Sequence, residues 1–203
     1  MNKYNFKNRL IISALLALFL TLYACSVPTD ESLLRKEFNI PETAVLLSYK
    51  ASPETSGWFG REGLKIDIVF QFNETDFANY ITEAEKSGSW RALPISQSFL
   101  MKIGSIARHK QGLIKSYELT GKKLPKEGSI YNPTEQKLYE NFIKTLPLDV
   151  KYGFYQCRTA GDNILFNTKT IVQEDLTTDL NDFMLAILNT DNKTLSIKVS
   201  TTY

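Results

Sequence analysis

The sequence has few of the side chains from which nucleophilic and metal-dependent active sites are built. It contains one histidine and two cysteines among 203 residues. A single histidine, His109, excludes a metal site made of several histidines, and it is expected near a helix C-terminus, where a cationic side chain is favourable. There is no G-x-S-x-G turn and no phosphate-binding loop with the required glycine spacing. The sequence therefore predicts no metal and no cofactor.

The two cysteines lie in different settings. Cys25 ends a long apolar run near the start of the chain, whereas Cys157 lies in the strand-like stretch KYGFYQCRT. If Cys25 is modified, Cys157 has no partner for a disulfide within the chain. We therefore expect Cys157 to be a small buried side chain without chemical function, because unpaired cysteines are among the most buried residues.

The N-terminus has the charge pattern of an export signal. Lys3, Lys7 and Arg9 carry its only charges and precede an uncharged run of 16 residues, 10–25. A membrane-spanning helix needs roughly 20 apolar residues. The run is therefore too short for a permanent span and fits the apolar part of a bacterial signal peptide.

The end of this run, Leu22-Tyr23-Ala24-Cys25, resembles the lipobox of bacterial lipoproteins. Tyr23 is bulkier than the residues usual at its position. The resemblance implies that diacylglycerol is attached to the Cys25 sulfur, that the leader is cut after Ala24, and that the new amino group is acylated, for example with palmitate. Several acyl chains hold a protein stably at a membrane. An uncleaved short anchor and a soluble secreted form are the alternatives.

The residue after the cysteine is Ser26. In the enterobacterial sorting rule that accompanies the resemblance, Asp at this position retains a lipoprotein in the inner membrane. Ser26 therefore favours the outer membrane, with the domain facing the periplasm. The membrane, reached through the acyl chains on Cys25, is then the first partner that the sequence predicts.

Removal of the leader changes the charge balance. The predicted organisation is a signal peptide at 1–24, a lipidated tether at 25–30 and one globular domain at 31–203. The leader holds three of the 24 basic residues, so the mature chain would have 21 basic and 22 acidic residues, a net charge of −1. No stretch concentrates basic residues as a nucleic-acid surface does, so we expect no nucleic-acid partner.

Hydrophobic periodicity predicts an α+β fold. The clearest strand is 64–72, where apolar residues alternate with Lys65, Asp67 and Gln71, so that one face is buried and the other is solvated. Strands are predicted at 44–52, 64–72, 113–120, 151–159, 163–172, 182–190 and 194–203, and helices at 28–41, 74–88, 96–112 and 133–147. Because strands follow strands in the chain, we expect a largely antiparallel sheet of six to seven strands with three to four helices.

Four acidic residues lie close together, at Glu174, Asp175, Asp179 and Asp182. Paired carboxylates carry out acid–base chemistry in glycoside hydrolases. Clustered carboxylates can also bind calcium, but the spacing here does not match a helix–loop–helix calcium site. We therefore expect these residues to belong to a solvated connection between strands.

Two stretches combine tryptophan with arginine. Trp58, Phe59 and Arg61 lie between glycines in a predicted hairpin loop, and Trp90 and Arg91 lie in a second loop. Aromatic and arginine side chains often anchor interfaces. These residues therefore form a candidate recognition loop, while the alternative is that the aromatic rings fold back and cover the core.

These features lead to a primary hypothesis and two alternatives. The first is a non-enzymatic binding or protective lipoprotein, similar to an immunity protein or inhibitor, whose partner is a protein or another envelope component. The second is a hydrolase of envelope material that uses Glu174, Asp175, Asp179 and Asp182. The third is an assembly factor of an envelope machine.

Overall fold

The computed structural model describes residues 29–56, 61–161 and 164–202. The chain forms two units, Met1–Ile40 and Pro41–Tyr203. In the first unit, helix α2 (Asp30–Glu37) begins after Thr29, whose side chain accepts a hydrogen bond from the Ser32 backbone N–H. This confirms the helix predicted within 28–41. The leader, Cys25 and Ser26 lie outside the described residues.

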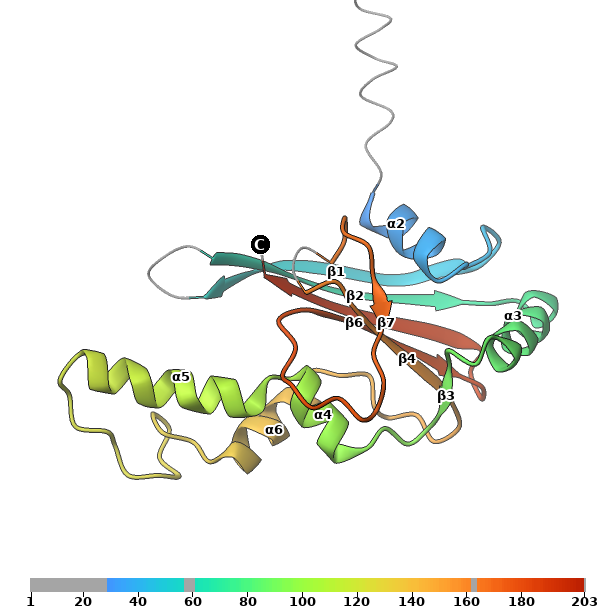
Figure 1. Ribbon diagram of the computed structural model, residues 1–203. Helices are drawn as coiled ribbons and strands as arrows, with labels where there is room; N and C mark the ends of the chain where they lie inside the picture. Colours follow the sequence, from blue (N-terminus) through green and yellow to red (C-terminus); the bar gives the residue numbers. More distant parts are fainter. Residues whose placement is uncertain (1–28, 57–60, 162–163, 203) are drawn as a thin grey trace, which may run out of the picture. The chain divides into compact units, whose positions relative to one another are not determined.

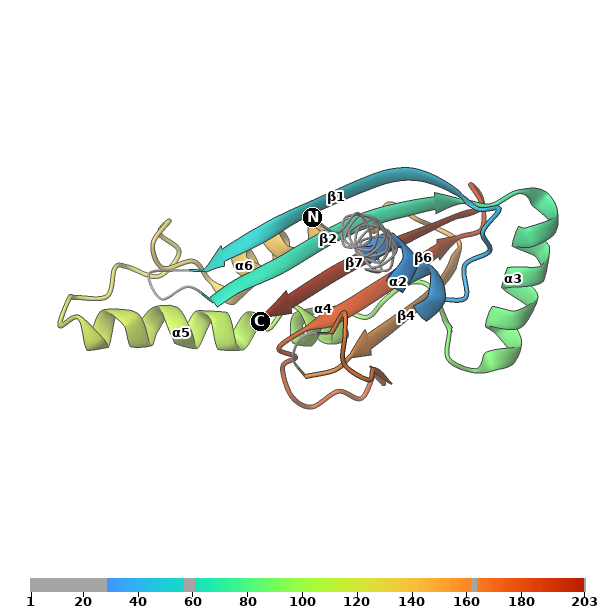
Figure 2. The same ribbon diagram turned by 90° about the horizontal axis from the view of Figure 1, so that it is seen from above.

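The second unit is built on one seven-stranded sheet in which all the pairings are antiparallel. Its order is β1-β2-β7-β6-β4-β3, and β5 also pairs with β4 (Figures 1 and 2). The strands are β1 (Val45–Ser56), β2 (Arg61–Gln71), β3 (Arg91–Ala92), β4 (Gly153–Thr159), β5 (Thr170–Ile171), β6 (Phe183–Asn189) and β7 (Thr194–Thr202). The predicted α+β class with an antiparallel sheet is confirmed.

The helices of this unit are α3 (Glu74–Ser87), α4 (Gln97–Ile103), α5 (Ile106–Leu119) and α6 (Glu135–Ile143). Helices α4, α5 and α6 lie on one face of the sheet, and α3 lies beyond one end of its strands (Figure 1). With α2, the described residues form five helices. The predicted number was three to four, and the difference arises where 96–112 divides into two.

The division of 96–112 occurs at Gly104 and Ser105. Ser105 has a φ of 49°, which a continuous helix does not allow. A Cβ atom on Gly104 would lie 2.6 Å from the Phe142 ring, so glycine lets α6 pack against the junction between α4 and α5. The packing of Phe142 is therefore a physical reason for a glycine at this position.

The strand predicted at 113–120 is wrong, because these residues continue α5 to Leu119. Leu113, Ile114 and Tyr117 are half-buried at helical spacing, which fits one face of a helix. The helix that starts at Ile106 therefore continues through a short apolar run whose sequence pattern is compatible with either a helix or a strand.

The strand predicted at 163–172 is also wrong over most of its length. Only Thr170 and Ile171 form a strand, β5. Residues 164–166 form a turn instead, in which Ile164 and Leu165 are both buried. The segment is therefore held by two neighbouring side chains rather than by a ladder of backbone hydrogen bonds.

The two halves of the sheet differ on the face that carries α4–α6. On the β4–β6 half, this face is apolar and forms the core. The cluster contains Phe183, Leu185, Ile187, Tyr155 and Cys157 from the sheet with Phe99, Leu100 and Ile103 from α4. Cys157 is buried there, as predicted.

On the β2–β7 half, the same face is polar. The strand register places Lys65 opposite Ser200, Asp67 opposite Lys198 and Val69 opposite Ser196. We call Lys65, Asp67, Ser196, Lys198 and Ser200 the polar stripe. The other face of β2 buries Ile66, Ile68 and Phe70, which confirms the predicted apolar face.

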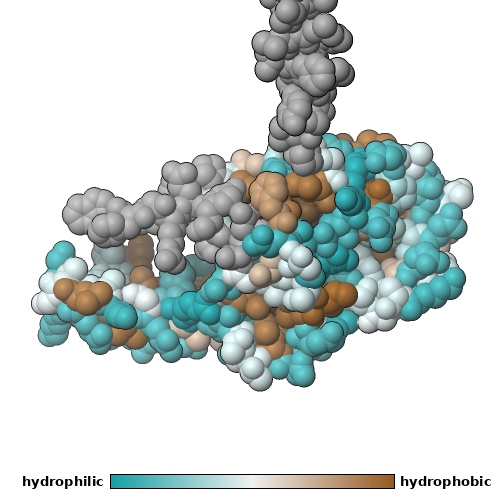
Figure 3. Space-filling model, turned by 45° about the horizontal axis from the view of Figure 1, so that its top comes forward, coloured by the Kyte–Doolittle hydropathy of each residue, from teal (hydrophilic) through white to brown (hydrophobic). Residues whose placement is uncertain are grey.

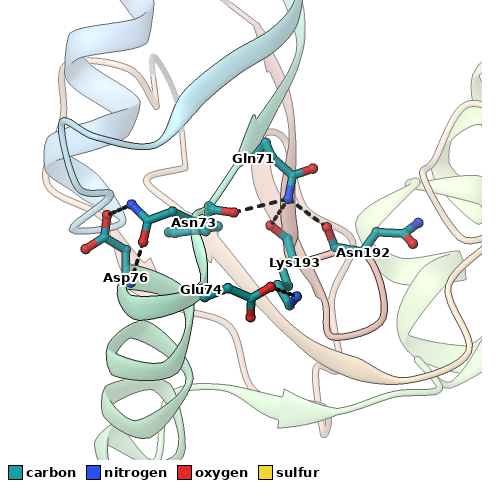
Figure 4. Close-up of polar contacts among 7 residues, drawn as sticks. Gln71, Asn73, Glu74, Asp76, Asn192 and Lys193 are labelled. Carbon is teal, nitrogen blue, oxygen red and sulfur yellow. Dashed lines mark hydrogen bonds and ion pairs between the residues drawn. The ribbon is translucent and has the colours of Figure 1, made fainter.

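The β6–β7 hairpin is tied to the end of β2 (Figure 4). The Gln71 side-chain amide donates hydrogen bonds to the backbone carbonyls of Asn192, at 2.8 Å, and Lys193, at 3.1 Å. Lys193 also forms an ion pair with Glu74 in the first turn of α3. These contacts fix the β6–β7 turn against the strand that carries Asp67.

Candidate binding cavity

A cavity of about 470 Å³ lies between the polar stripe and the helices α4, α5 and α6. This volume falls within the range typical of small-molecule sites. The apolar part of its lining includes Ile103, Ile106, Leu138, Phe142 and Phe183. The polar part includes Lys65, Lys198, Ser200, Ser105, His109, Asn141, Thr145 and Asn181.

Lys198 is the most deeply buried charged group in this lining. Its side chain is 6% exposed, and its Nζ donates to Asp67 Oδ1 at 2.8 Å. An ammonium group has three N–H donors, and Asp67 is its sole hydrogen-bond partner among the residues that the structure describes. A buried charge with unused donors is costly unless a further acceptor reaches it.

The carboxylate partner of Lys198 lies outside the larger cavity. Asp67 lines a smaller neighbouring cavity of about 220 Å³, and Thr145 lines both. The described lining of the larger cavity holds Lys65 and Lys198 and has no carboxylate. The carboxylate that pairs with Lys198 is therefore not part of the wall of this cavity.

One wall is fixed by the connection between β5 and β6. The Leu180 backbone N–H donates to the Lys102 carbonyl at 3.2 Å, and the Ser105 hydroxyl donates to the Leu180 carbonyl. The Arg108 backbone N–H donates to Asp179 Oδ2 at 3.1 Å. The start of α5 and residues 179–181 are thus held together beside the cavity.

His109 lies near the start of α5 and lines the cavity. The expectation that it sits near a helix C-terminus is wrong, because the helix runs on to Leu119 rather than ending at Gly112.

The four carboxylates that the sequence singles out have different surroundings. Glu174 and Asp175 are exposed. Asp179 contacts Lys102 at 3.5 Å as well as Arg108. Asp182 is buried. None of the four lines the 470 Å³ cavity.

Asp182 anchors the turn that follows β4. Its Oδ1 accepts hydrogen bonds from the Thr159 hydroxyl at 2.6 Å and from the Gly161 backbone N–H at 3.0 Å. Its Oδ2 is buried and has no hydrogen-bond partner among the described residues. Over residues 29–56, 61–161 and 164–202, no three His, Cys, Asp or Glu side chains are grouped to hold a metal ion.

Two of the predicted site residues meet at the edge of the sheet. Arg91 lies in β3 opposite Tyr155 of β4, and its guanidinium is 3.8 Å from Glu174. The Tyr155 hydroxyl donates to Glu174, and burial together with this hydrogen bond raises the pKa of Tyr155 well above its usual value. This group is an edge contact in which arginine, tyrosine and carboxylate satisfy one another.

Of the two tryptophans singled out from the sequence, the described residues include Trp90 but not Trp58. Trp90 is half-buried and packs edge-on against Tyr80, with ring centroids 6.1 Å apart. Trp58 and Phe59 lie outside the described residues, as does the side chain of Arg61. The predicted recognition loop at these three residues stays a prediction.

Sequence reasoning did not find Lys198 or Asp67. A signal was present, because Lys198 stands between Ile197 and Val199 in a strand whose apolar residues alternate. A lysine in the middle of such a strand indicates a polar feature on the other face. Its partner at Asp67 is 131 residues away and could not be paired with it from the sequence.

Comparisons of the chain with models of protein families, with characterised proteins and with solved structures found no match. Among the described residues, none of the helices combines the length and apolar character needed to cross a bilayer.

Proposed function

We propose that this chain is a lipid-anchored protein of a bacterial cell envelope whose folded domain binds a small amphipathic anion in the 470 Å³ cavity. The proposal takes its location, the periplasmic face of the outer membrane, from the lipobox-like residues before Cys25 and from Ser26. It takes its ligand class from the lining of the cavity. It assigns binding to the domain and no reaction.

The observation that carries the proposal is the position of Lys198. Its ammonium is almost fully buried and uses one donor on Asp67. An anionic group in the cavity would accept from the remaining donors, and such charge-assisted bonds are about twice as strong as neutral ones. A carboxylate and a phosphate have this chemistry in common.

The helical side of the cavity favours a ligand with an apolar part. Ile106 and Phe142 line it opposite the polar stripe. A short alkyl chain against these side chains would gain about 0.8 kcal/mol for each buried methylene. A charged head at Lys198 and an apolar body toward the helices therefore fit the two kinds of wall.

The test compares ligands that differ in charge. The full chain is titrated with hexanoate, hexyl phosphate, inorganic phosphate and the neutral hexanamide, and binding is followed by thermal shift and isotope-edited NMR. We expect the two alkyl anions to bind and hexanamide to bind at least about tenfold more weakly, since hydrogen bonds to charged groups contribute 1.5–3 kcal/mol. Inorganic phosphate distinguishes recognition of the anion alone from recognition of an amphiphile.

The matched variants are Lys198→Met and Lys193→Met. Lys193 lies in the β6–β7 turn and pairs with Glu74, away from the cavity lining. We expect Lys198→Met to lose anion binding and Lys193→Met to keep it. Equal binding by the two variants, or equal binding of hexanoate and hexanamide, would rule out the proposed site.

The anchor has its own test. Mass spectrometry of the protein from membranes should find a chain that begins at an acylated Cys25, and Cys25→Ser should release the protein from the membrane fraction. A chain that begins at Met1 with an unmodified sulfur would contradict the anchor and leave the cavity proposal standing.

A further inference from the structure

A tight turn displays two large apolar side chains to solvent at the end of the molecule where α5 finishes. The Asn132 backbone N–H donates to the Ser129 carbonyl at 3.2 Å, which places Ile130 and Tyr131 at the corners of the turn. Ile130 is 87% exposed and Tyr131 is 69% exposed. Turn corners are usually glycine, proline, asparagine, aspartate or serine, so this pair is unusual.

The turn is held by buried polar groups. Asn132 is buried, its Oδ1 accepts from Lys110 Nζ at 2.6 Å, and its Nδ2 donates to the Pro125 carbonyl at 2.7 Å. Lys110, which is also buried, donates to the Pro133 carbonyl at 2.8 Å and contacts Glu127 at 3.1 Å. The apolar tip is therefore preorganised by a network anchored in α5.

The surroundings of the tip are apolar and basic. Leu119 and Leu124 are exposed nearby in the chain, and Figure 3 shows hydrophobic surface near the C-terminal end of α5. Three exposed lysines lie in the same loop, at Lys122, Lys123 and Lys126. Lys122 lines a cavity of about 490 Å³ together with Ile130 and Tyr131.

The charge of this region differs from that of the whole mature chain. Residues 115–131 contain four lysines and two glutamates, and one of the glutamates, Glu127, is paired with Lys110. The mature chain would be close to neutral. Positive charge is thus concentrated around an exposed apolar tip, which is the combination that favours the interface of an anionic membrane.

We propose that the turn Ser129–Asn132 inserts Ile130 and Tyr131 into the interfacial region of a membrane that contains anionic lipids, while Lys122, Lys123 and Lys126 bind the headgroups. Tyrosine suits this role because its ring is apolar and its hydroxyl stays hydrated. A protein partner with an acidic surface is the competing occupant. The proposal is independent of the cavity and its ligand.

The test measures the depth of the tip in a bilayer. The full chain carrying Tyr131→Trp is reconstituted into vesicles of phosphatidylcholine with or without phosphatidylglycerol, and quenching by brominated acyl chains is recorded above the background of the native tryptophans. Asn79→Trp, at an exposed position on α3, is the matched control. We expect the tip probe to be quenched about twofold or more above the control in the anionic vesicles and less in the neutral ones.

A second experiment tests whether the three lysines of this loop contribute to insertion. Changing Lys122, Lys123 and Lys126 to glutamine should lower the equilibrium constant for insertion by about fivefold for each lysine removed. Lys86→Gln, on the exposed side of α3, should leave it unchanged. The proposal is overturned if the tip probe and the α3 probe are quenched equally in anionic vesicles, the result expected if the tip binds a protein.

Discussion

Asp67 and Lys198 lie directly opposite each other on β2 and β7, and their side chains meet at 2.8 Å, yet they differ widely in exposure. The Asp67 side chain is 49% exposed, whereas that of Lys198 is 6% exposed. Water can therefore stabilise the carboxylate without its partner, but it reaches the ammonium poorly. The free-energy cost of separating the pair falls mainly on Lys198.

This asymmetry predicts unequal effects of two substitutions. Asp67→Asn leaves a buried ammonium without its carboxylate and should lower the free energy of unfolding by about 1–3 kcal/mol. Lys198→Met replaces the charge by an apolar side chain of similar length and should cost less, because Asp67 keeps its hydration. Urea unfolding of both variants and of the double variant measures this, and equal losses would contradict it.

Two glycines near the helical layer should respond in opposite ways to alanine. Gly104→Ala would place a Cβ atom 2.6 Å from the Phe142 ring and should lower stability by about 1–3 kcal/mol through overpacking. Gly112 lies within α5, and a Cβ atom there would meet no described residue within 4 Å apart from its chain neighbours and the backbone of its own helix. Gly112→Ala should raise stability by about 0.5–1 kcal/mol through helix propensity. Thermal unfolding of both variants checks the signs.

Alkaline pH should destabilise the domain through Cys157. Burial, with a smaller effect of the nearby Asp182 charge, raises the pKa of this thiol above its usual value. The unfolded chain then loses the proton at lower pH than the folded chain, so stability is fully present below the usual thiol pKa of about 8.5 and falls as pH rises above it.

Cys157→Ala provides the control for this effect. In this variant, the loss of stability above the ordinary thiol pKa of about 8.5 should become smaller. Tyr80 and Tyr155, whose pKa values are also raised by burial, should still reduce stability above about pH 10. In the native protein, Cys157 should react with a thiol reagent only as fast as the protein opens. Rapid labelling under native conditions would show that the thiol is accessible.

The tip that carries Ile130 and Tyr131 should depend on Lys110. Lys110→Met leaves the Asn132 side-chain oxygen and the Pro133 carbonyl without their donor, and it should cost about 1–3 kcal/mol. Lys115→Met, on an exposed position of the same helix, should change stability by less than about 0.5 kcal/mol. Hydrogen exchange of the Gly128 and Asn132 amides, which close the turn, should accelerate in the first variant alone.

Local patterns were sufficient for several elements. Alternating apolar residues predicted β2, and Phe77 and Ala84 at helical spacing, ended by Gly88, predicted α3. These predictions succeeded because burial of a single face imposes a clear period on the sequence. The N-caps at Thr29 and Asn73 add local hydrogen bonds that do not depend on distant residues.

Short apolar runs were not sufficient. The sequence predicts a strand at 113–120, but the structure continues α5 from Ile106 through this stretch to Leu119. The sequence predicts a strand at 163–172, but residues 164–166 form a turn in which Ile164 and Leu165 are both buried. In both cases tertiary packing outweighed local preference.

The sequence by itself determined the class of the fold and the burial of Cys157, since each is written in a contiguous pattern. Tertiary structure alone decided the cavity. Lys198 and Asp67 are 131 residues apart, and antiparallel pairing of β2 with β7 brings them together while the helices close over one of them. A charged residue within a strand indicates that one face of the strand is polar. Which residue pairs with it, and whether water reaches it, depend on how the whole chain packs.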